Sequence, residues 1–181
     1  MKAKGIEIEF TADNPANIRK ALQSHKNILI RGIQGVGKIT NTMKAVKDEP
    51  HVYYVGNPFD YEGKKRPVSY EKYLLYINSL KSDLTVVDDM KKLLEMDSPM
   101  ILIIDEIYGR SSSQMELIGR LLDRPNTRVI QIVGCMKYMG KLIDKIDIII
   151  DLHHDGAFSV DKDLARSICS VLGSKEQTLF N

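Results

Sequence analysis

The chain is poor in the features that mark secreted, membrane or metal-dependent folds. Its 181 residues include only two cysteines, Cys135 and Cys169, which lie in apolar surroundings without a C-x-x-C spacing. A disulfide framework or a structural zinc site is therefore not expected, and the thiols suit a reducing compartment. No apolar run approaches the roughly 18 residues of a membrane span, and the first residues lack the apolar centre of a signal peptide. We expect a cytoplasmic protein with no membrane partner.

The charge of the chain is nearly balanced. Its 26 basic and 24 acidic residues give a formal net charge of +2, which by itself points to no class of partner. No repeat or low-complexity segment stands out, and the length suits one domain with a substantial core. We expect a single domain over residues 1–181, with an N-terminal adapter at 1–26, a core at 27–152 and a C-terminal turn, strand and helix at 153–181.

The most informative stretch is ILIRGIQGVGKITNT, residues 28–42. It predicts a strand at 27–31, a glycine-rich turn and a helix from about residue 38 to residue 46. Glycine lets consecutive backbone N–H groups turn inward around an anion, and the helix adds its positive end. The Lys38 ammonium can then reach the outer phosphates of a nucleotide. The residues predicted to line this phosphate cradle are Gly32, Gln34, Gly35, Val36, Gly37, Lys38, Ile39 and Thr40.

One position departs from the usual pattern G-x-x-x-x-G-K-[ST]. The hydroxyl that normally follows the lysine and binds Mg²⁺ is replaced by Ile39, with Thr40 one residue late. Nucleotide binding is therefore better supported than hydrolysis. Either Thr40 reaches the metal from a shifted first helical turn, or a carboxylate elsewhere and water hold the metal without it.

The rest of the chain alternates apolar runs with helical patterns. Further strands are expected at 52–55, 100–106, 127–134 and 146–152, with short ones at 5–10 and within 153–160, and helices near 14–22, 112–122, 136–145 and 161–172. The segment 84–94 is helical or mixed. This alternation predicts an α/β, three-layer domain with a mainly parallel sheet of about five strands.

A second motif stands at the end of the expected strand 100–106. Its apolar run ends in Asp105 and Glu106, so both acids are expected at the carboxyl edge of a parallel sheet, where the glycine turn also lies. Asp105 can hold Mg²⁺ directly or through water, and Glu106 can orient or deprotonate an attacking water. The alternative is a polar strand end that supplies charge to the next helix.

Taken in order, the segments GIQGVGK, ILIIDE and TRVIQIVGC resemble a known group. They look like the P-loop NTPases that have an additional strand between the Walker A and Walker B strands and a catalytic glutamate, such as the AAA+ ATPases and the FtsK and HerA type DNA-pumping ATPases. The resemblance covers about 27–152. It implies that Lys38 binds the β- and γ-phosphates of ATP, Asp105 the Mg²⁺ and Glu106 the water.

The same resemblance implies a polar sensor near Gln131 or Cys135, although neither is the Asn or Thr most typical of AAA+ proteins. The 29 residues from His153 to Asn181 are too few for an AAA+ lid. The segment MKYMGKLIDKIDIIIDL also resembles the stretch after the fourth strand of DNA-pumping and packaging ATPases, with lysines in place of arginines.

Proteins of this group act as rings in which an arginine of a neighbouring subunit completes the active site. The resemblance therefore implies a homo-oligomer. Arg124 and Arg128 are the first candidates for that arginine and Arg120 the next, while charge at a helix end or in a solvated loop is the alternative for each.

Two other clusters of residues give weaker indications of function. Lys64, Lys65 and Arg66 lie among aromatic residues, which suits either a nucleic-acid contact or a solvated loop before an amphipathic helix. The run His153-His154-Asp155 is expected to form a turn rather than a metal site.

The sequence thus predicts an ATP-binding and hydrolysing P-loop ATPase that works as an oligomer on nucleic acid or a protein partner. GTP is disfavoured because the chain has no N-K-x-D motif. A non-catalytic nucleotide-binding regulator or scaffold with a degenerate Walker A motif, and a small-molecule kinase, would use the same cradle.

Overall fold

A computed structural model of the protein describes residues 9–56, 68–106, 110–160, 163 and 166. Its centre is a seven-stranded sheet in the order β3-β2-β4-β5-β1-β6-β7. The strands are β1 (Asn27–Arg31), β2 (Val52–Val55), β3 (Thr85–Val86), β4 (Met100–Asp105), β5 (Thr127–Val133), β6 (Ile148–His153) and β7 (Gly156–Ser159). All neighbouring strands are parallel except β6 and β7. The predicted α/β class with a mainly parallel sheet is confirmed.

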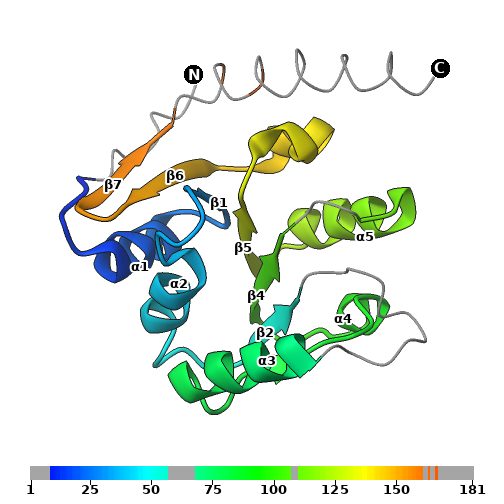
Figure 1. Ribbon diagram of the computed structural model, residues 1–181. Helices are drawn as coiled ribbons and strands as arrows, with labels where there is room; N and C mark the ends of the chain where they lie inside the picture. The colour runs from blue at the N-terminus through cyan, green and yellow to red at the C-terminus, as the bar shows by residue number, and fades with distance from the viewer. Residues whose placement is uncertain (1–8, 57–67, 107–109, 161–162, 164–165, 167–181) are drawn as a thin grey trace.

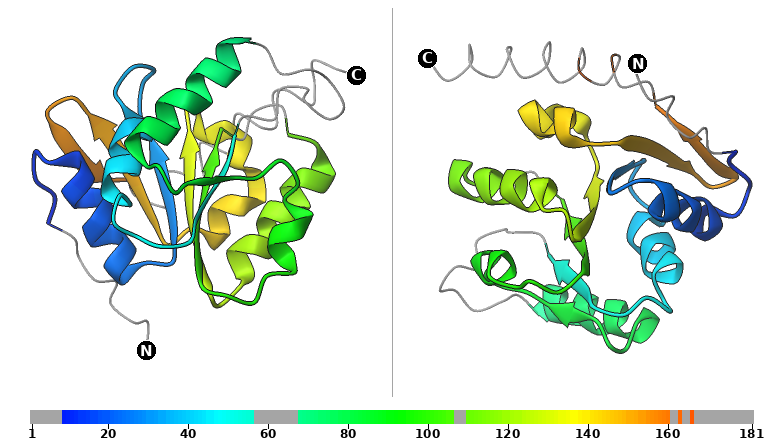
Figure 2. Two further views of the ribbon diagram at one scale, coloured as in Figure 1. Left: turned by 90° about the horizontal axis from the view of Figure 1, so that it is seen from below. Right: turned by 180° about the vertical axis from the view of Figure 1, so that it is seen from behind.

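Helices cover both faces of this sheet (Figure 1). They are α1 (Asn14–Ser24), α2 (Lys38–Ala45), α3 (Val68–Leu80), α4 (Lys91–Leu94), α5 (Ser112–Asp123) and the 3₁₀ segment η1 (Met136–Lys145). The first three pack on one face and the last three on the other, which gives the expected three layers (Figure 2). No helix in the described part of the chain is long and apolar enough to cross a membrane.

The core follows from the alternation of side chains along each strand. In β1, Ile28 and Ile30 pack towards α1, α2 and α3, while Leu29 packs towards the opposite helices. The central strands β1, β4 and β5 are covered by helices on both faces, and their sequences are therefore mostly apolar along their whole length.

The strand order places β5 between β1 and β4, although β4 precedes β5 in the chain. This is the additional strand that the resemblance implied between the two motif-bearing strands. The five expected strands β2, β4, β5, β1 and β6 all form, and β3 and β7 extend the sheet at its two edges.

Several local expectations need correction or lie outside the described residues. The helix expected at 136–145 forms with these bounds as a 3₁₀ helix, and it is broken at Gly140, where φ is 50°. The ambiguous stretch 84–94 contains β3 and α4. Glu9 and Phe10, the last two residues of the strand expected at 5–10, belong to no strand. The first part of that strand and the helix expected at 161–172 fall outside the described residues.

Candidate nucleotide site

The glycine loop connects the end of β1 to the start of α2. A Cβ atom on Gly32 would lie 2.8 Å from the Leu152 carbonyl oxygen and 2.9 Å from Val36 Cγ1, so the close approach of β6 excludes any side chain there. Gly37 has a φ of 85° and is the N-cap of α2, with no side-chain bond to the first-turn N–H groups. Those N–H groups point towards the loop, as an anion site requires.

Lys38 folds back over this loop. Its Nζ donates to the carbonyl oxygens of Gly32, at 2.7 Å, and Ile33, at 3.1 Å. Burial lowers the pKa of Lys38, while the charges of Glu106 and Asp105 act in the opposite direction. The ammonium therefore lies within electrostatic reach of both acids, and phosphate oxygens can take the place of its carbonyl partners.

Asp105 ends β4 on the face of the sheet that α2 and α3 cover. Its Oδ2 accepts hydrogen bonds from the Tyr54 hydroxyl, at 2.7 Å, and the Tyr73 hydroxyl, at 2.9 Å. Burial raises the pKa of this carboxyl, and the two phenols and Arg110 offset part of that rise. Burial also raises the pKa of Tyr54, so that phenol stays a donor. The carboxylate is thus held in one orientation at the carboxyl edge.

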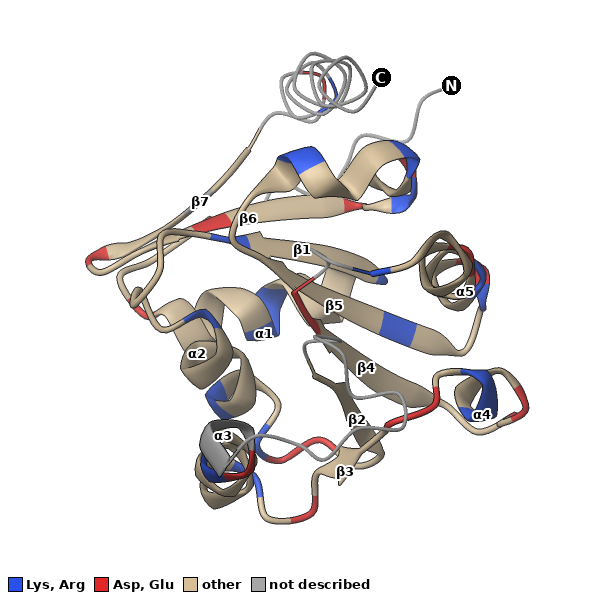
Figure 3. Ribbon diagram, turned by 45° about the vertical axis from the view of Figure 1, so that its right-hand side comes forward, with Lys and Arg blue, Asp and Glu red and all other residues tan. Residues whose placement is uncertain are grey.

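Glu106 follows in a strained backbone conformation, with a φ of 56° (Figure 3 shows the acidic end of β4 in red beside β5). Such a conformation in a residue other than glycine costs roughly 1–3 kcal/mol. The Glu106 N–H donates to the Ile132 carbonyl oxygen at 2.9 Å, and Oε2 accepts from the Gly134 N–H at 3.2 Å. The change in chain direction at Glu106 therefore places its carboxylate beside the end of β5.

Arg110 is a site residue that the sequence did not reveal. Its Nε donates to the Glu106 carbonyl oxygen at 2.9 Å, and its Nη2 donates to the carbonyl oxygens of Gly56, at 3.0 Å, and Asp105, at 3.2 Å. The Arg110 guanidinium therefore links the residue after β2 to the backbone of Asp105 and Glu106 through hydrogen bonds. Its only sequence signal is its position four residues after Glu106.

Of the two residues after Lys38, one has no hydroxyl and the other has its hydroxyl engaged. Ile39 packs against the core beneath α2, and the Thr40 hydroxyl is hydrogen-bonded to the Tyr76 hydroxyl of α3 at 2.8 Å. To bind a metal in the cradle, Thr40 would have to release that bond. The described residues contain no group of three or more His, Cys, Asp or Glu side chains that could hold a metal. While Thr40 keeps that bond, Mg²⁺ in this site would depend on Asp105, phosphate oxygens and water, a common set of ligands beside a nucleotide.

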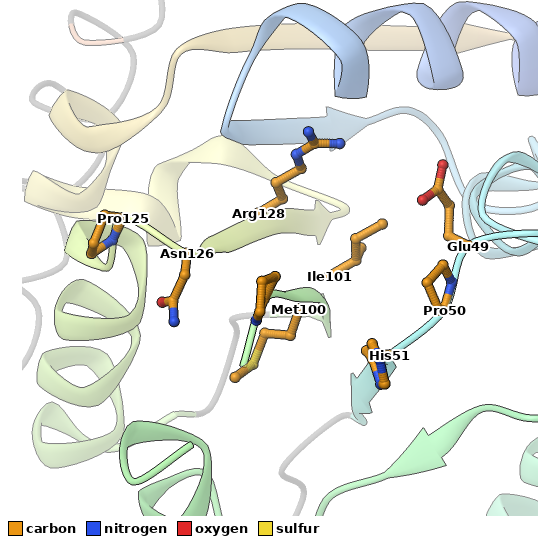
Figure 4. A pocket seen from close by; sticks show the side chains of 9 residues that line it. Glu49, Pro50, His51, Met100, Ile101, Pro125, Asn126 and Arg128 are labelled. Atoms are coloured by element: carbon orange, nitrogen blue, oxygen red, sulfur yellow. The ribbon is translucent and has the colours of Figure 1, made fainter. Parts of the chain in front are cut away.

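The two arginines expected to act between subunits lie away from the glycine loop: Arg124 at the end of α5 and Arg128 on β5. Arg124 donates from Nη1 to the carbonyl oxygens of Leu93, at 2.9 Å, and Leu94, at 2.7 Å, and from Nη2 to that of Met96. Arg128 is exposed on β5 and lines a pocket of about 320 Å³ at the amino ends of β2, β4 and β5 (Figure 4). The glycine loop lies at the opposite, carboxyl ends of the strands, so neither arginine joins the site of its own chain.

The remaining expected residues are placed as follows. Gln131 is fully buried, its Nε2 lies 3.4 Å from the Ile104 carbonyl oxygen, and its Oε1 has no hydrogen-bond partner among the described residues. Cys135 is a half-buried free thiol. His154 and Asp155 form the turn between β6 and β7, as expected. Lys64, Lys65 and Arg66 lie outside the described residues.

Comparison with known proteins finds similar solved structures but no similar family model or curated sequence. No protein-family model matches the chain, and no curated protein matches its sequence. Among solved structures, the chain is similar to the VirB11 ATPase from the Brucella suis type IV secretion system, solved in complex with sulphate, with a TM-score of 0.47 and 13% identity. The match covers 86% of this chain and 54% of that one, so this chain spans about half the length of the VirB11 structure. A likeness at this level carries no conclusion about activity.

The class of the protein is defined by its strand order and its loop. A glycine loop between β1 and α2 and an acidic strand end on β4, separated by the inserted β5, make a P-loop NTPase-like fold.

Proposed function

We propose that the protein binds ATP with Mg²⁺ at the glycine loop and hydrolyses it. The observation that carries this proposal is the meeting of three charged side chains from two distant segments. Lys38, Asp105 and Glu106 lie at one edge of the sheet, and the electrostatic effect of both acids reaches the lysine ammonium. Asp105 is a half-buried carboxyl whose pKa is raised by burial, and Glu106 has a strained backbone; both features are enriched at functional sites, which favours a chemical role.

The roles follow from the positions. The loop N–H groups and Lys38 bind the phosphates, and Asp105 holds Mg²⁺ directly or through water. When bound, Mg²⁺ neutralises charge on the phosphate oxygens. Glu106 orients a water and accepts its proton on the carboxylate that the Gly134 N–H positions. Arg110 fixes the backbone of both acids and so acts as a positioning residue.

A non-catalytic nucleotide-binding regulator is the second candidate, and one observation favours it. Ile39 packs into the core and the Thr40 hydroxyl is engaged with Tyr76, so the loop offers no hydroxyl for Mg²⁺ in this state. Phosphate release from ATP, measured with Mg²⁺ and with EDTA in the presence and absence of DNA, separates the two candidates. Mg²⁺-dependent release supports the hydrolase, and ATP binding without release supports the regulator.

Substitution of Ile39 tests the missing hydroxyl directly. Ile39→Thr is expected to raise Mg²⁺-dependent turnover about tenfold, because a hydroxyl at this position adds one metal ligand. Ile39→Val is the matched control, since it keeps the branched shape without the hydroxyl. Equal turnover in the two variants would show that a hydroxyl at this position contributes nothing.

We further propose that the active form is a homo-oligomer in which Arg128 or Arg124 reaches the site of a neighbour. Arg128→Ala is expected to lower turnover tenfold or more and to spare nucleotide binding, because the arginine stabilises charge only during transfer. If Arg124 is instead the arginine that reaches the neighbour, Arg124→Ala should have this effect, with an added loss of stability because its guanidinium donates to the last two carbonyl oxygens of α4. Steady-state turnover and ATP affinity are the two measurements, and unchanged turnover in both variants would rule the arginines out.

A further inference from the structure

Helix α3 contacts two of the residues expected to bind Mg²⁺, each through a tyrosine. The Tyr73 hydroxyl donates to Asp105 Oδ2 at 2.9 Å, and the Tyr76 hydroxyl is hydrogen-bonded to Thr40 Oγ1 at 2.8 Å. Tyr73 and Tyr76 are three residues apart, so both lie on the same side of the helix. That side faces α2, against which α3 packs (Figure 2).

The C-terminal end of α3 is held by contacts that do not involve the residues expected to bind Mg²⁺. Lys81, directly after the helix, is almost fully buried, and its ammonium donates to the carbonyl oxygens of Lys47, at 3.1 Å, and Glu49, at 2.8 Å. Leu74 and Ile77 pack into the core below. The C-terminal end of the helix is therefore attached to the segment after α2 independently of the nucleotide site.

The tyrosine contacts engage the same two side chains, Asp105 and Thr40, that a bound metal would use. Mg²⁺ takes oxygen ligands in a near-octahedral arrangement and tolerates little distortion. Two phenol hydrogens already approach Asp105 Oδ2, from Tyr54 and Tyr73, and the Thr40 hydroxyl is turned to Tyr76. Tyr54 belongs to β2, which is paired on both sides, and has no exposed surface, so its position is fixed. Tyr73 and Tyr76 belong to a helix on the surface, and theirs are the bonds that can open.

We propose that α3 is a magnesium-sensing element of the nucleotide site: Tyr73 and Tyr76 hold Asp105 and Thr40 in the metal-free state, and binding of Mg²⁺ with nucleotide breaks both hydrogen bonds. The proposal rests on the proposed function, because it takes the glycine loop as the nucleotide site. Its consequence is that the part of α3 around Tyr73 and Tyr76 loosens only when metal and nucleotide are bound together.

Hydrogen exchange of the full chain tests this directly. Backbone amides of residues 71–77 are followed in EDTA, in EDTA with a non-hydrolysable ATP analogue, and in Mg²⁺ with the same analogue, while calorimetry records binding in each solution. Exchange is expected to rise about tenfold in Mg²⁺ with the analogue and to stay unchanged with the analogue in EDTA.

Tyr76→Phe removes one hydroxyl from an exposed side chain and leaves Asp105 and its charge untouched. It is expected to tighten Mg²⁺-dependent binding of the analogue about fivefold and to leave binding in EDTA unchanged, because one competing hydrogen bond is gone. Tyr53→Phe, on the opposite face of β2, is the matched control and should behave as the wild type.

Unchanged exchange of α3 in a sample that binds the Mg²⁺ complex would overturn this inference and leave the proposed function standing. Weaker Mg²⁺-dependent binding by Tyr76→Phe would overturn it as well. Absence of nucleotide binding in every solution would overturn the inference and the proposed function together.

Discussion

The Glu106→Gln variant is expected to bind ATP and Mg²⁺ as the wild type does and to release phosphate at least about 100-fold more slowly. A general base contributes on the order of 10²–10⁴ to a rate, and an amide cannot accept the proton. Glutamine has the same size, and its side-chain oxygen can still accept the hydrogen bond from the Gly134 N–H. The loss should therefore appear in kcat and not in affinity. Steady-state phosphate release and calorimetry with ATP measure the two quantities.

Glu116→Gln is the matched control for this change. Glu116 is exposed on α5, and its replacement removes the same charge from the protein without touching the site. Wild-type turnover in Glu106→Gln would refute the role of Glu106 as the base. Loss of ATP affinity in that variant would instead place Glu106 among the binding residues.

Lys38→Ala is expected to lower ATP affinity at least roughly 100-fold. Hydrogen bonds to charged groups contribute about 1.5–3 kcal/mol each, and the Lys38 ammonium reaches more than one oxygen in the loop. The fold should persist, because the protein partners of this ammonium are two carbonyl oxygens of the loop after β1 rather than core groups. Calorimetry with ATP and thermal melting of the same sample separate affinity from stability.

Lys44→Ala serves as the control for the lysine variant. Lys44 is exposed on the same helix, so its loss changes the net charge equally and leaves the loop intact. If Lys38→Ala bound ATP as tightly as Lys44→Ala does, the phosphates would have to be bound elsewhere.

The parts of the fold that could be predicted from the sequence are those with local causes. Gly32, Gly35 and Gly37 all have a positive φ, which glycine adopts without strain, so their spacing in the sequence marked the loop between the strand and the helix directly. The helix expected near 14–22 is α1, which has Pro15 in its first turn and is capped by Asp13, whose side chain accepts a hydrogen bond from the Ala16 N–H. Buried parallel strands were visible as apolar runs because both faces are covered.

The parts that were missed depend on distant pairing. Tyr54 reaches Asp105 because β2 pairs with β4 so that Tyr54 lies opposite Ile103, and no pattern in the sequence fixes that register. Tyr73 and Arg110 reach the site only through the placement of α3 and of the chain after β4. The break at Gly140 follows from a left-handed backbone, where the apolar spacing alone suggested a continuous helix.

Asp105 and Glu106 show the same difference between local features that can be predicted and features that depend on distant pairing. Their position at a strand end could be predicted, and so could their meeting with Lys38 at one edge of a parallel sheet. The strained backbone of Glu106 and the phenol bonds of Asp105 could not, because both come from neighbours on β5, β2 and α3.

Calorimetric titration of the wild-type protein with ATP, in Mg²⁺ and again in EDTA, is the most direct test of the nucleotide site. We predict saturable binding of one ATP per chain that is tighter in Mg²⁺ than in EDTA and is lost in Lys38→Ala. No binding at millimolar ATP in either solution, or binding that Lys38→Ala leaves unchanged, would contradict the assignment of the glycine loop as a nucleotide site.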